Sequence, residues 1–235
     1  MNAVNICFLG SSYIGAVYSA YRGKVESGEK AWSIDFYGHS NGGFSNVDII
    51  NGHISNVRFK SNESRPVNAY DALVIYADLP SPHDVLKATA SASQAGCSQQ
   101  VVGQVASDLI RSSNAFRLAQ AFRSQTGKPV LMLSGNVVSV TNTKMDDLRL
   151  FEILDLFYAN LDEHIYVPFP RHMFDHVNRP LKEFYKDSIL LTGDRAGADA
   201  AGHDNHHMNE RGGREILTAV EQCLEQLFVC RTQAA

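Results

Sequence analysis

A serine follows the first apolar segment of the sequence at a position that suits a nucleophile. Residues 4–9 form a short apolar run, and the loop Gly10–Gly15 (GSSYIG) comes directly after it. A serine hydroxyl at such a strand-to-helix turn lies near the free main-chain N–H groups of the helix N-terminus, which can stabilise a developing oxyanion. Ser12 is the candidate, and Ser11 competes with it. The alternative is structural, because a serine at the start of a helix is also a common N-cap.

A carboxylate and an imidazole lie close together near the other end of the chain. The segment Gly202–Glu210 reads GHDNHHMNE, in which Asp204 and His207 are three residues apart. At the start of a helix, residues at this spacing can share one face. A carboxylate beside an imidazole fixes its tautomer and stabilises its cation, which a serine nucleophile needs from its base. The alternative is a solvated loop in which Asp204 or Asn205 caps the following helix.

The two segments together resemble the opening and closing blocks of the SGNH/GDSL hydrolases. The run Gly10–Ser12 looks like the Gly-Asp-Ser block of that family, with Ser11 at the position of its Asp or Asn. The run Asp204–Asn209 (DNHHMN) looks like the closing Asp-x-x-His block with its His-x-Asn extension. By this resemblance the catalytic residues are Ser12, Asp204 and His207.

The resemblance also implies an activity and a fold. The expected activity is that of a serine esterase, which hydrolyses O-acyl esters through an acyl-enzyme and requires no cofactor. The expected substrate is a small-molecule ester, such as an acetylated carbohydrate or the ester of another small alcohol. The expected fold is one domain over residues 1–235, a flavodoxin-like three-layer α/β/α sandwich with a five-stranded parallel sheet. Transfer of the acyl group to another hydroxyl, or a fold retained for binding without catalysis, are the alternatives.

Two further blocks of that family supply oxyanion donors, a glycine N–H after the second strand and an asparagine amide after the third. Gly42 and Gly43 are candidates for the glycine, and Gly43 is preferred because it directly precedes the apolar Phe44. After the third predicted strand the chain reads Asp78–Pro82 (DLPSP), which lacks the family's Gly-x-Asn-Asp. Asn136 follows the fourth predicted strand and is the fallback donor, although a loop asparagine is more often a turn residue.

Apolar runs alternate with helical patterns along the chain, which is typical of a parallel sheet covered on both faces. The predicted strands are residues 4–9, 32–37, 71–77, 129–133 and 187–192. The predicted helices, from apolar residues at 3.6-residue spacing, are residues 12–21, 98–125, 145–161 and 210–230. Ligands bind outside the carboxyl ends of such strands, so the loops that follow strands are the expected site.

Glycine, serine and asparagine residues indicate where these elements end or bend. The helix over residues 98–125 can break at Gly103 or at residues 112–114, and Gly127 is expected to end it. The dipeptide at residues 51–52, Asn-Gly between two apolar runs, predicts a small β-hairpin appended to the sheet. Residues 164–180 are expected to be irregular.

Composition excludes several classes of partner. The chain has 235 residues, of which 44% are hydrophobic and 20% charged, as in ordinary soluble domains. Its net charge is −4, and its basic residues are dispersed, so we expect no nucleic-acid partner. The run at residues 4–9 is too short for a signal peptide, and none approaches the roughly 18 apolar residues of a membrane span. With four cysteines and no CxxC spacing, we expect a cytoplasmic protein without membrane association.

Two other site chemistries compete with the serine hydrolase. The loop Gly10–Gly15 has the outer glycines of the GxGxxG dinucleotide fingerprint of a Rossmann domain, but Ser12 replaces the middle one. The acid Asp35 also lies within the second predicted strand rather than at its end, where it would bind a ribose. A metal-dependent hydrolase could instead use His203, Asp204, His206 and His207, with His172, Asp175 and His176. The sequence contains no HExxH motif.

Overall fold

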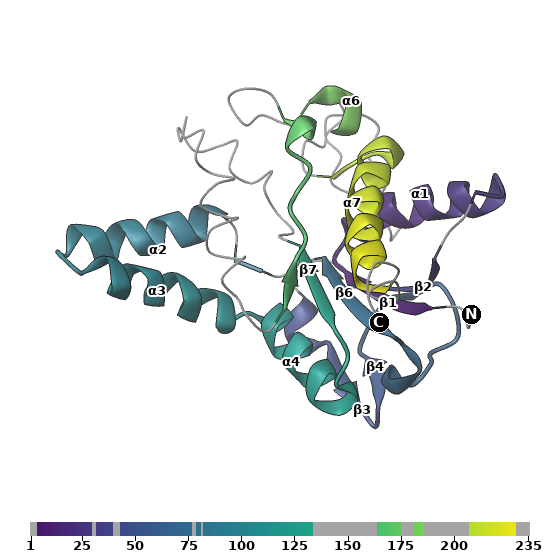
Figure 1. Cartoon of the computed structure of the whole chain (residues 1–235), viewed down its shortest axis with the longest axis horizontal. Coiled ribbons are helices and arrows are strands. Elements are labelled where there is room, and N and C mark those ends of the chain that lie inside the picture. The colour runs from purple at the N-terminus through teal and green to yellow at the C-terminus, as the bar shows by residue number, and fades with distance from the viewer. Residues whose placement is uncertain are drawn as a thin grey trace.

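A computed structural model describes most of the chain, including Ser12 and His207 of the predicted site (Figure 1). The described residues are 4–29, 32–39, 43–76, 79–80, 82–133, 164–174, 181–185 and 207–228. Within them, no helix combines the length and apolar character needed to cross a lipid bilayer.

The centre of the molecule is a six-stranded, mostly parallel sheet. Its strands are β1 (Asn5–Gly10), β2 (Ser33–Gly38), β5 (Phe59–Lys60), β6 (Ala72–Tyr76), β7 (Val130–Leu133) and β8 (Ile165–Tyr166). They lie side by side in the order β5-β2-β1-β6-β7-β8, and only the edge strand β5 is antiparallel to its neighbour. Among the five parallel strands, numbered along the chain, the spatial order is therefore second, first, third, fourth, fifth. The mixed α/β class expected from the sequence is confirmed.

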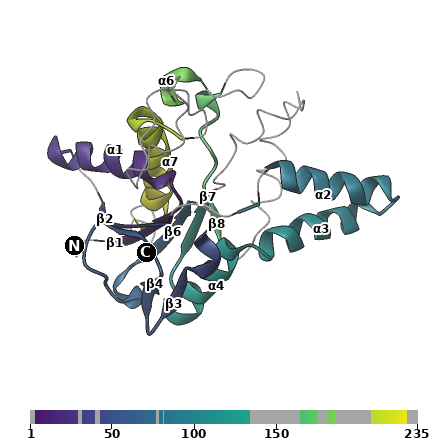
Figure 2. The same ribbon diagram turned by 180° about the vertical axis from the view of Figure 1, so that it is seen from behind.

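Helices cover both faces of this sheet. The helices α1 (Ile14–Glu26) and α7 (Glu210–Phe228) lie together on one side, and α4 (Asn114–Thr126) lies on the other (Figure 1). The short helix α6 (Lys182–Tyr185) contacts α7. The helices α2 (Pro82–Gln94) and α3 (Gln99–Arg111) pack on each other and project from the body, as Figures 1 and 2 both show. The described residues also include three 3₁₀ turns: η1 (Gly43–Asn46), η2 (Val67–Ala69) and η4 (Arg171–Met173).

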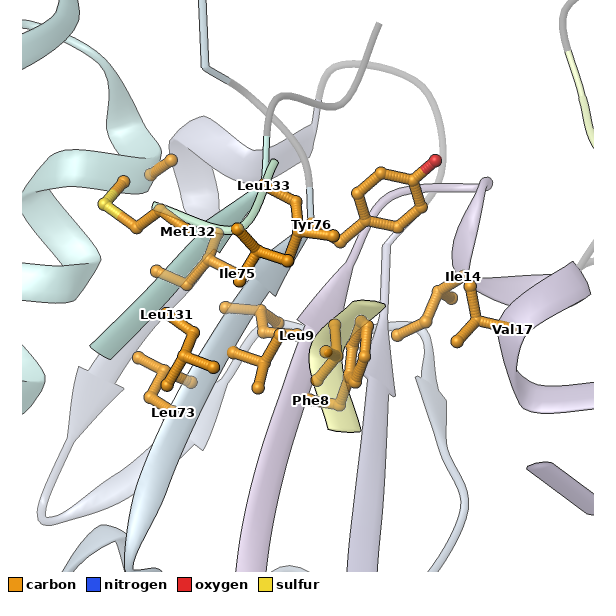
Figure 3. Packing of buried hydrophobic residues seen from close by; sticks show 14 of the residues in the cluster. Phe8, Leu9, Ile14, Val17, Leu73, Ile75, Tyr76, Leu131, Met132 and Leu133 are labelled. Carbon is orange, nitrogen blue, oxygen red and sulfur yellow. The ribbon is translucent and has the colours of Figure 1, made fainter. Parts of the chain in front are cut away.

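The apolar strands form the core because both of their faces are covered. All five residues of β6 and the last five of β1 are buried, so these two strands read as continuous apolar runs rather than alternating ones. On the α1 side, Phe8 stacks on Phe36 with ring centroids 5.2 Å apart. Figure 3 shows Ile14 and Val17 of α1 close to Phe8, while Leu73 and Leu131 pack together beside Leu9. These buried side chains fix β1 and β6 within the core, and the candidate site lies at the carboxyl ends of the two strands.

Two expectations about strands were wrong. The hairpin forms, with Asn51 and Gly52 at positive φ between β3 (Asp48–Ile50) and β4 (His53–Ser55). It is a separate two-stranded sheet rather than an addition to the central one. The stretch expected to be irregular contains β8, which pairs with β7 as the fifth parallel strand, and the turn η4. A strand of two residues carries too little periodic signal to be recognised in the sequence.

Polar residues decide where the helices begin and end. The predicted helix over residues 98–125 is broken into α3 and α4, because Ser113 caps α4 by accepting a hydrogen bond from the Phe116 N–H. Gly103 does not break α3, while Gly127 at φ 67° ends α4 as expected. The helix α2 was not predicted, although Pro82 is its first residue, a favoured place for proline. The predicted helix 145–161 and strand 187–192 lie outside the described residues.

Candidate active site

The tight turn after β1 places Ser11 and Ser12 at the carboxyl edge of the sheet. The Gly10 carbonyl accepts a hydrogen bond from the His39 N–H at 3.0 Å, and the Ser11 N–H donates to the Tyr76 carbonyl at 3.4 Å. The turn is so tight that a Cβ on Gly10 would lie only 2.8 Å from Ile14 Cβ. Main-chain hydrogen bonds thus connect the turn to the ends of β2 and β6, on either side of β1.

The hydroxyl of Ser12 is not used to cap the helix that follows. The N-cap position of α1 is Tyr13, and no side-chain hydrogen bond caps this end. Instead, Ser12 Oγ lies 2.8 Å from His207 Nε2, although the two residues are 195 positions apart in the sequence. This distance is within the reach required between a serine nucleophile and its general base. The structural alternative for Ser12, an N-cap, is therefore wrong.

Close packing of α7 on α1 brings His207 to Ser12. His207 lies three residues before α7, which contacts α1 along its length. A Cβ on Gly213 would lie only 2.1 Å from the Ala16 carbonyl oxygen, so the two main chains approach as only glycine allows. An ion pair between Lys24 and Glu221 at 2.6 Å joins the two helices farther along. The site is thus assembled by a helix-to-helix contact.

The imidazole of His207 is stacked on the ring of Tyr13, with centroids 5.0 Å apart and an angle of 27° between the planes. Tyr13 is also tilted against Tyr76, at 6.2 Å and 53°. The Tyr76 hydroxyl donates to Met208 Sδ at 3.9 Å, and Figure 3 shows its ring at the edge of the packed strand side chains. His207 therefore lies against a largely apolar wall formed by the end of β6 and the start of α1.

Two hydroxyl groups of this region are buried and have no hydrogen-bond partner among the described residues. They are Ser11 Oγ, beside the nucleophile, and the hydroxyl of Tyr185 in α6. Burial raises the pKa of Tyr185, and the nearby Tyr13 adds to this effect. Burial also raises the pKa of Tyr76, with smaller contributions from Tyr185 and Tyr13. Both phenols therefore stay protonated and neutral across the ordinary pH range, and place no negative charge near His207.

Of the other expected site residues, Gly43 alone lies within the described residues. Gly43 is the first residue of η1, in the connection that follows β2, where the family resemblance puts a glycine donor. Asp204 and Asn136 both lie outside the described residues, as does Gly42. The structure therefore brings together two of the five residues predicted for the site, Ser12 and His207.

The competing chemistries fit the described residues poorly. Asp35 is 3% exposed, and its carboxylate accepts hydrogen bonds from Asn62 and Tyr70, so it is not available to a ribose. Of the proposed metal ligands, His207 is bonded to Ser12, and His172 lies 2.9 Å from Glu215. No set of three His, Cys, Asp or Glu side chains within the described part of the chain could hold a metal ion. The remaining proposed ligands, His203, Asp204, His206, Asp175 and His176, lie outside those residues.

Sequence reasoning missed part of the wall around His207. Tyr76 is the last residue of a predicted buried strand, so the rule that sites lie at carboxyl ends could have identified it. Met208 could have been considered because it directly follows His207 in the sequence. Tyr185 lies in a four-residue helix and carries no such signal.

No family model matches the sequence, and no curated protein or solved structure matches it significantly.

Proposed function

We propose that this protein is a serine esterase of the SGNH kind that hydrolyses O-acyl esters. The observation that carries the proposal is the 2.8 Å separation between Ser12 Oγ and His207 Nε2. A serine after the first strand paired with a histidine just before the last helix is the arrangement that the two sequence blocks imply. A pair of this kind converts a poorly nucleophilic hydroxyl into an effective one by removing its proton during attack.

The proposed reaction has two steps, with His207 transferring the proton in both. In the first, His207 Nε2 accepts the Ser12 hydroxyl proton while Ser12 Oγ attacks the ester carbonyl. The tetrahedral intermediate then collapses, and the alcohol leaves with the proton from His207, which leaves an acyl group on Ser12. In the second step, His207 removes a proton from water, the hydroxide attacks the acyl group, and Ser12 recovers its proton as the acid departs. Asp204 is proposed to accept a hydrogen bond from the other ring nitrogen and orient the imidazole.

Main-chain donors near Ser12 would stabilise the oxyanion. The Ser12 N–H lies at the N-terminal end of α1, where free N–H groups favour negative charge, and it donates no hydrogen bond within the described residues. The proposed second donor is the N–H of Gly43, and Asn136 is the proposed third. If only two donors act, hydrolysis of simple esters will be slow, since one missing donor typically costs about 100- to 1,000-fold in rate.

The arrangement of the sheet supports the same assignment. The order second, first, third, fourth, fifth for the parallel strands is the order of flavodoxin-like folds. In that fold, ligands bind where the direction of the strand order reverses, between the first and third parallel strands. Those strands are β1 and β6 here, and the Ser11 N–H bonds to the last residue of β6. Ser12 therefore occupies the position at which such a sheet offers a binding site.

A fluorophosphonate probe tests the proposal, because it reacts covalently only with an activated serine. We expect stoichiometric labelling of Ser12, located by mass spectrometry of the peptide. Labelling should be lost in Ser12→Ala and strongly slowed in His207→Gln, and Ser11→Ala serves as the matched control that retains it. Label that persists in Ser12→Ala, or that is found on Ser11 in the unmodified protein, would contradict the assignment. Short-chain nitrophenyl esters and acetylated sugars would then define the acyl and alcohol preference.

A further inference from the structure

The ring of Tyr13 contacts the proposed general base through its face. The stacked geometry, 5.0 Å between centroids at 27°, places the aromatic face rather than the hydroxyl against the imidazole. An aromatic face carries partial negative charge, and it attracts a cation within about 6 Å of its centroid. Tyr13 therefore offers a surface that favours imidazolium over neutral imidazole.

A closed set of contacts holds this ring in place. Tyr13 directly follows Ser12, and its ring lies between His207 and Tyr76. The Tyr76 hydroxyl donates in turn to Sδ of Met208, the residue after His207. Tyr76 is 1% exposed and Met208 is also 1% exposed, so neither can move without disturbing the core. The nucleophile, the stacked ring and the base are thus connected through neighbours in the chain and through buried contacts.

We propose that Tyr13 is a positioning residue, which fixes the orientation of the His207 ring and stabilises the imidazolium that forms as Ser12 attacks. This inference rests on the proposed esterase function. A general base accepts the proton as neutral imidazole, so in the proposed reaction the His207 ring gains its positive charge only as the proton leaves Ser12. The attraction of the aromatic face for the cation is therefore greater in the transition state than in the ground state, which is the condition for accelerating the chemical step. Substrate binding should not depend on it.

Labelling kinetics with the fluorophosphonate test this proposal, because the probe reacts through the same proton transfer. Tyr13→Leu keeps apolar bulk but removes the aromatic face, and the maximal labelling rate should fall about 3- to 30-fold, with half-saturation unchanged. Tyr13→Phe keeps the face and should label within about twofold of the unmodified protein. Tyr18→Leu is the matched control, since Tyr18 lies in α1, which directly follows Tyr13, but packs against Phe36 and Phe59. It should leave the labelling rate unchanged.

Proton NMR of the His207 ring provides a readout that does not depend on activity. A stacked aromatic ring shifts the His207 ring protons, and this shift should disappear in Tyr13→Leu while remaining in Tyr13→Phe and Tyr18→Leu. Labelling of Tyr13→Leu at the unmodified rate, or equal slowing in Tyr13→Phe, would overturn the role of Tyr13 and leave the esterase proposal intact. Failure of the unmodified protein to label at Ser12 would overturn the esterase proposal itself, and this inference with it.

Discussion

Two polar clusters of this protein differ in how their hydrogen bonds are satisfied. In the cluster around Asp35, the carboxylate accepts from Asn62 at 2.5 Å and from Tyr70 at 2.9 Å, and Arg65 lies 3.2 Å away. The Tyr70 hydroxyl is also bonded to Tyr37 at 2.7 Å. The cluster connects β2, the segment after β5 and the residue after η2.

The cluster around Ser12 is less completely paired. Ser12 and His207 are hydrogen-bonded to each other, but Ser11 Oγ and the Tyr185 hydroxyl are buried and have no hydrogen-bond partner in the part of the chain that the structure describes. A buried polar group without a partner costs free energy, and native proteins tolerate few of them. Where a local rule is broken without local compensation, function is a common reason. The cluster around Asp35 therefore stabilises the fold, whereas the cluster around Ser12 costs folding free energy.

The largest expected difference comes from removing the central residue of each cluster. Ser12→Ala should lower ester hydrolysis by on the order of 10,000-fold or more, as loss of a serine nucleophile does, while changing the free energy of unfolding by less than about 0.5 kcal/mol. Asp35→Ala should instead lower the free energy of unfolding by about 2–4 kcal/mol, because it leaves buried donors unpaired. Urea denaturation and ester hydrolysis per folded molecule measure both effects. Hydrolysis that is abolished in a well-folded Asp35→Ala protein would break the comparison.

A second prediction concerns the contact that assembles the Ser12 cluster. Gly213→Ala forces a Cβ against the Ala16 main chain, so α7 must shift, and we expect a loss of about 2–4 kcal/mol in the free energy of unfolding. Fluorophosphonate labelling of the remaining folded protein should slow at least about tenfold, since α7 carries His207 and small misplacements are costly.

Gly103→Ala is the matched control for that prediction. Gly103 lies within α3, and a Cβ there meets nothing within 4 Å. The substitution should stabilise the protein by about 0.5–1 kcal/mol through helix propensity, without any change in labelling rate. Normal labelling by Gly213→Ala would show that the position of His207 does not depend on the contact between α1 and α7.

The smallest expected effect is the difference in stability between removing a hydrogen-bonded tyrosine hydroxyl and removing one that has no described partner. Tyr70→Phe removes a hydroxyl that is bonded to both Asp35 and Tyr37, and should cost about 1–2 kcal/mol. Tyr185→Phe removes a buried hydroxyl that no described residue pairs with, and should leave the free energy of unfolding unchanged or raise it by up to about 1 kcal/mol. Thermal unfolding of the two variants side by side measures the difference. Equal destabilisation by both would mean that the Tyr185 hydroxyl is paired in solution.

Much of the local structure could be predicted because its causes lie within a few residues. The apolar runs at β1, β6 and β7 predicted buried strands, Asn51-Gly52 predicted a hairpin, and Gly127 predicted a helix end. The apolar spacing in α7 predicted a closing helix that begins at Glu210, as the structure has it. The exceptions were β8, which has only two residues, and α2, which begins at Pro82 and was not predicted. In these cases tertiary contacts outweigh a weak local signal.

The site divides in the same way. The resemblance of two short blocks made Ser12 and His207 candidates, and it left Ser11 and an N-capping role as alternatives for the first block. Only the tertiary structure brings Ser12, rather than Ser11, within hydrogen-bond distance of His207, and this contact depends on how closely α7 approaches α1 at Gly213. The stacking of Tyr13 on His207 and the complete pairing of Asp35 have the same origin. Each joins residues far apart in the chain, and no local pattern encodes their distance or orientation.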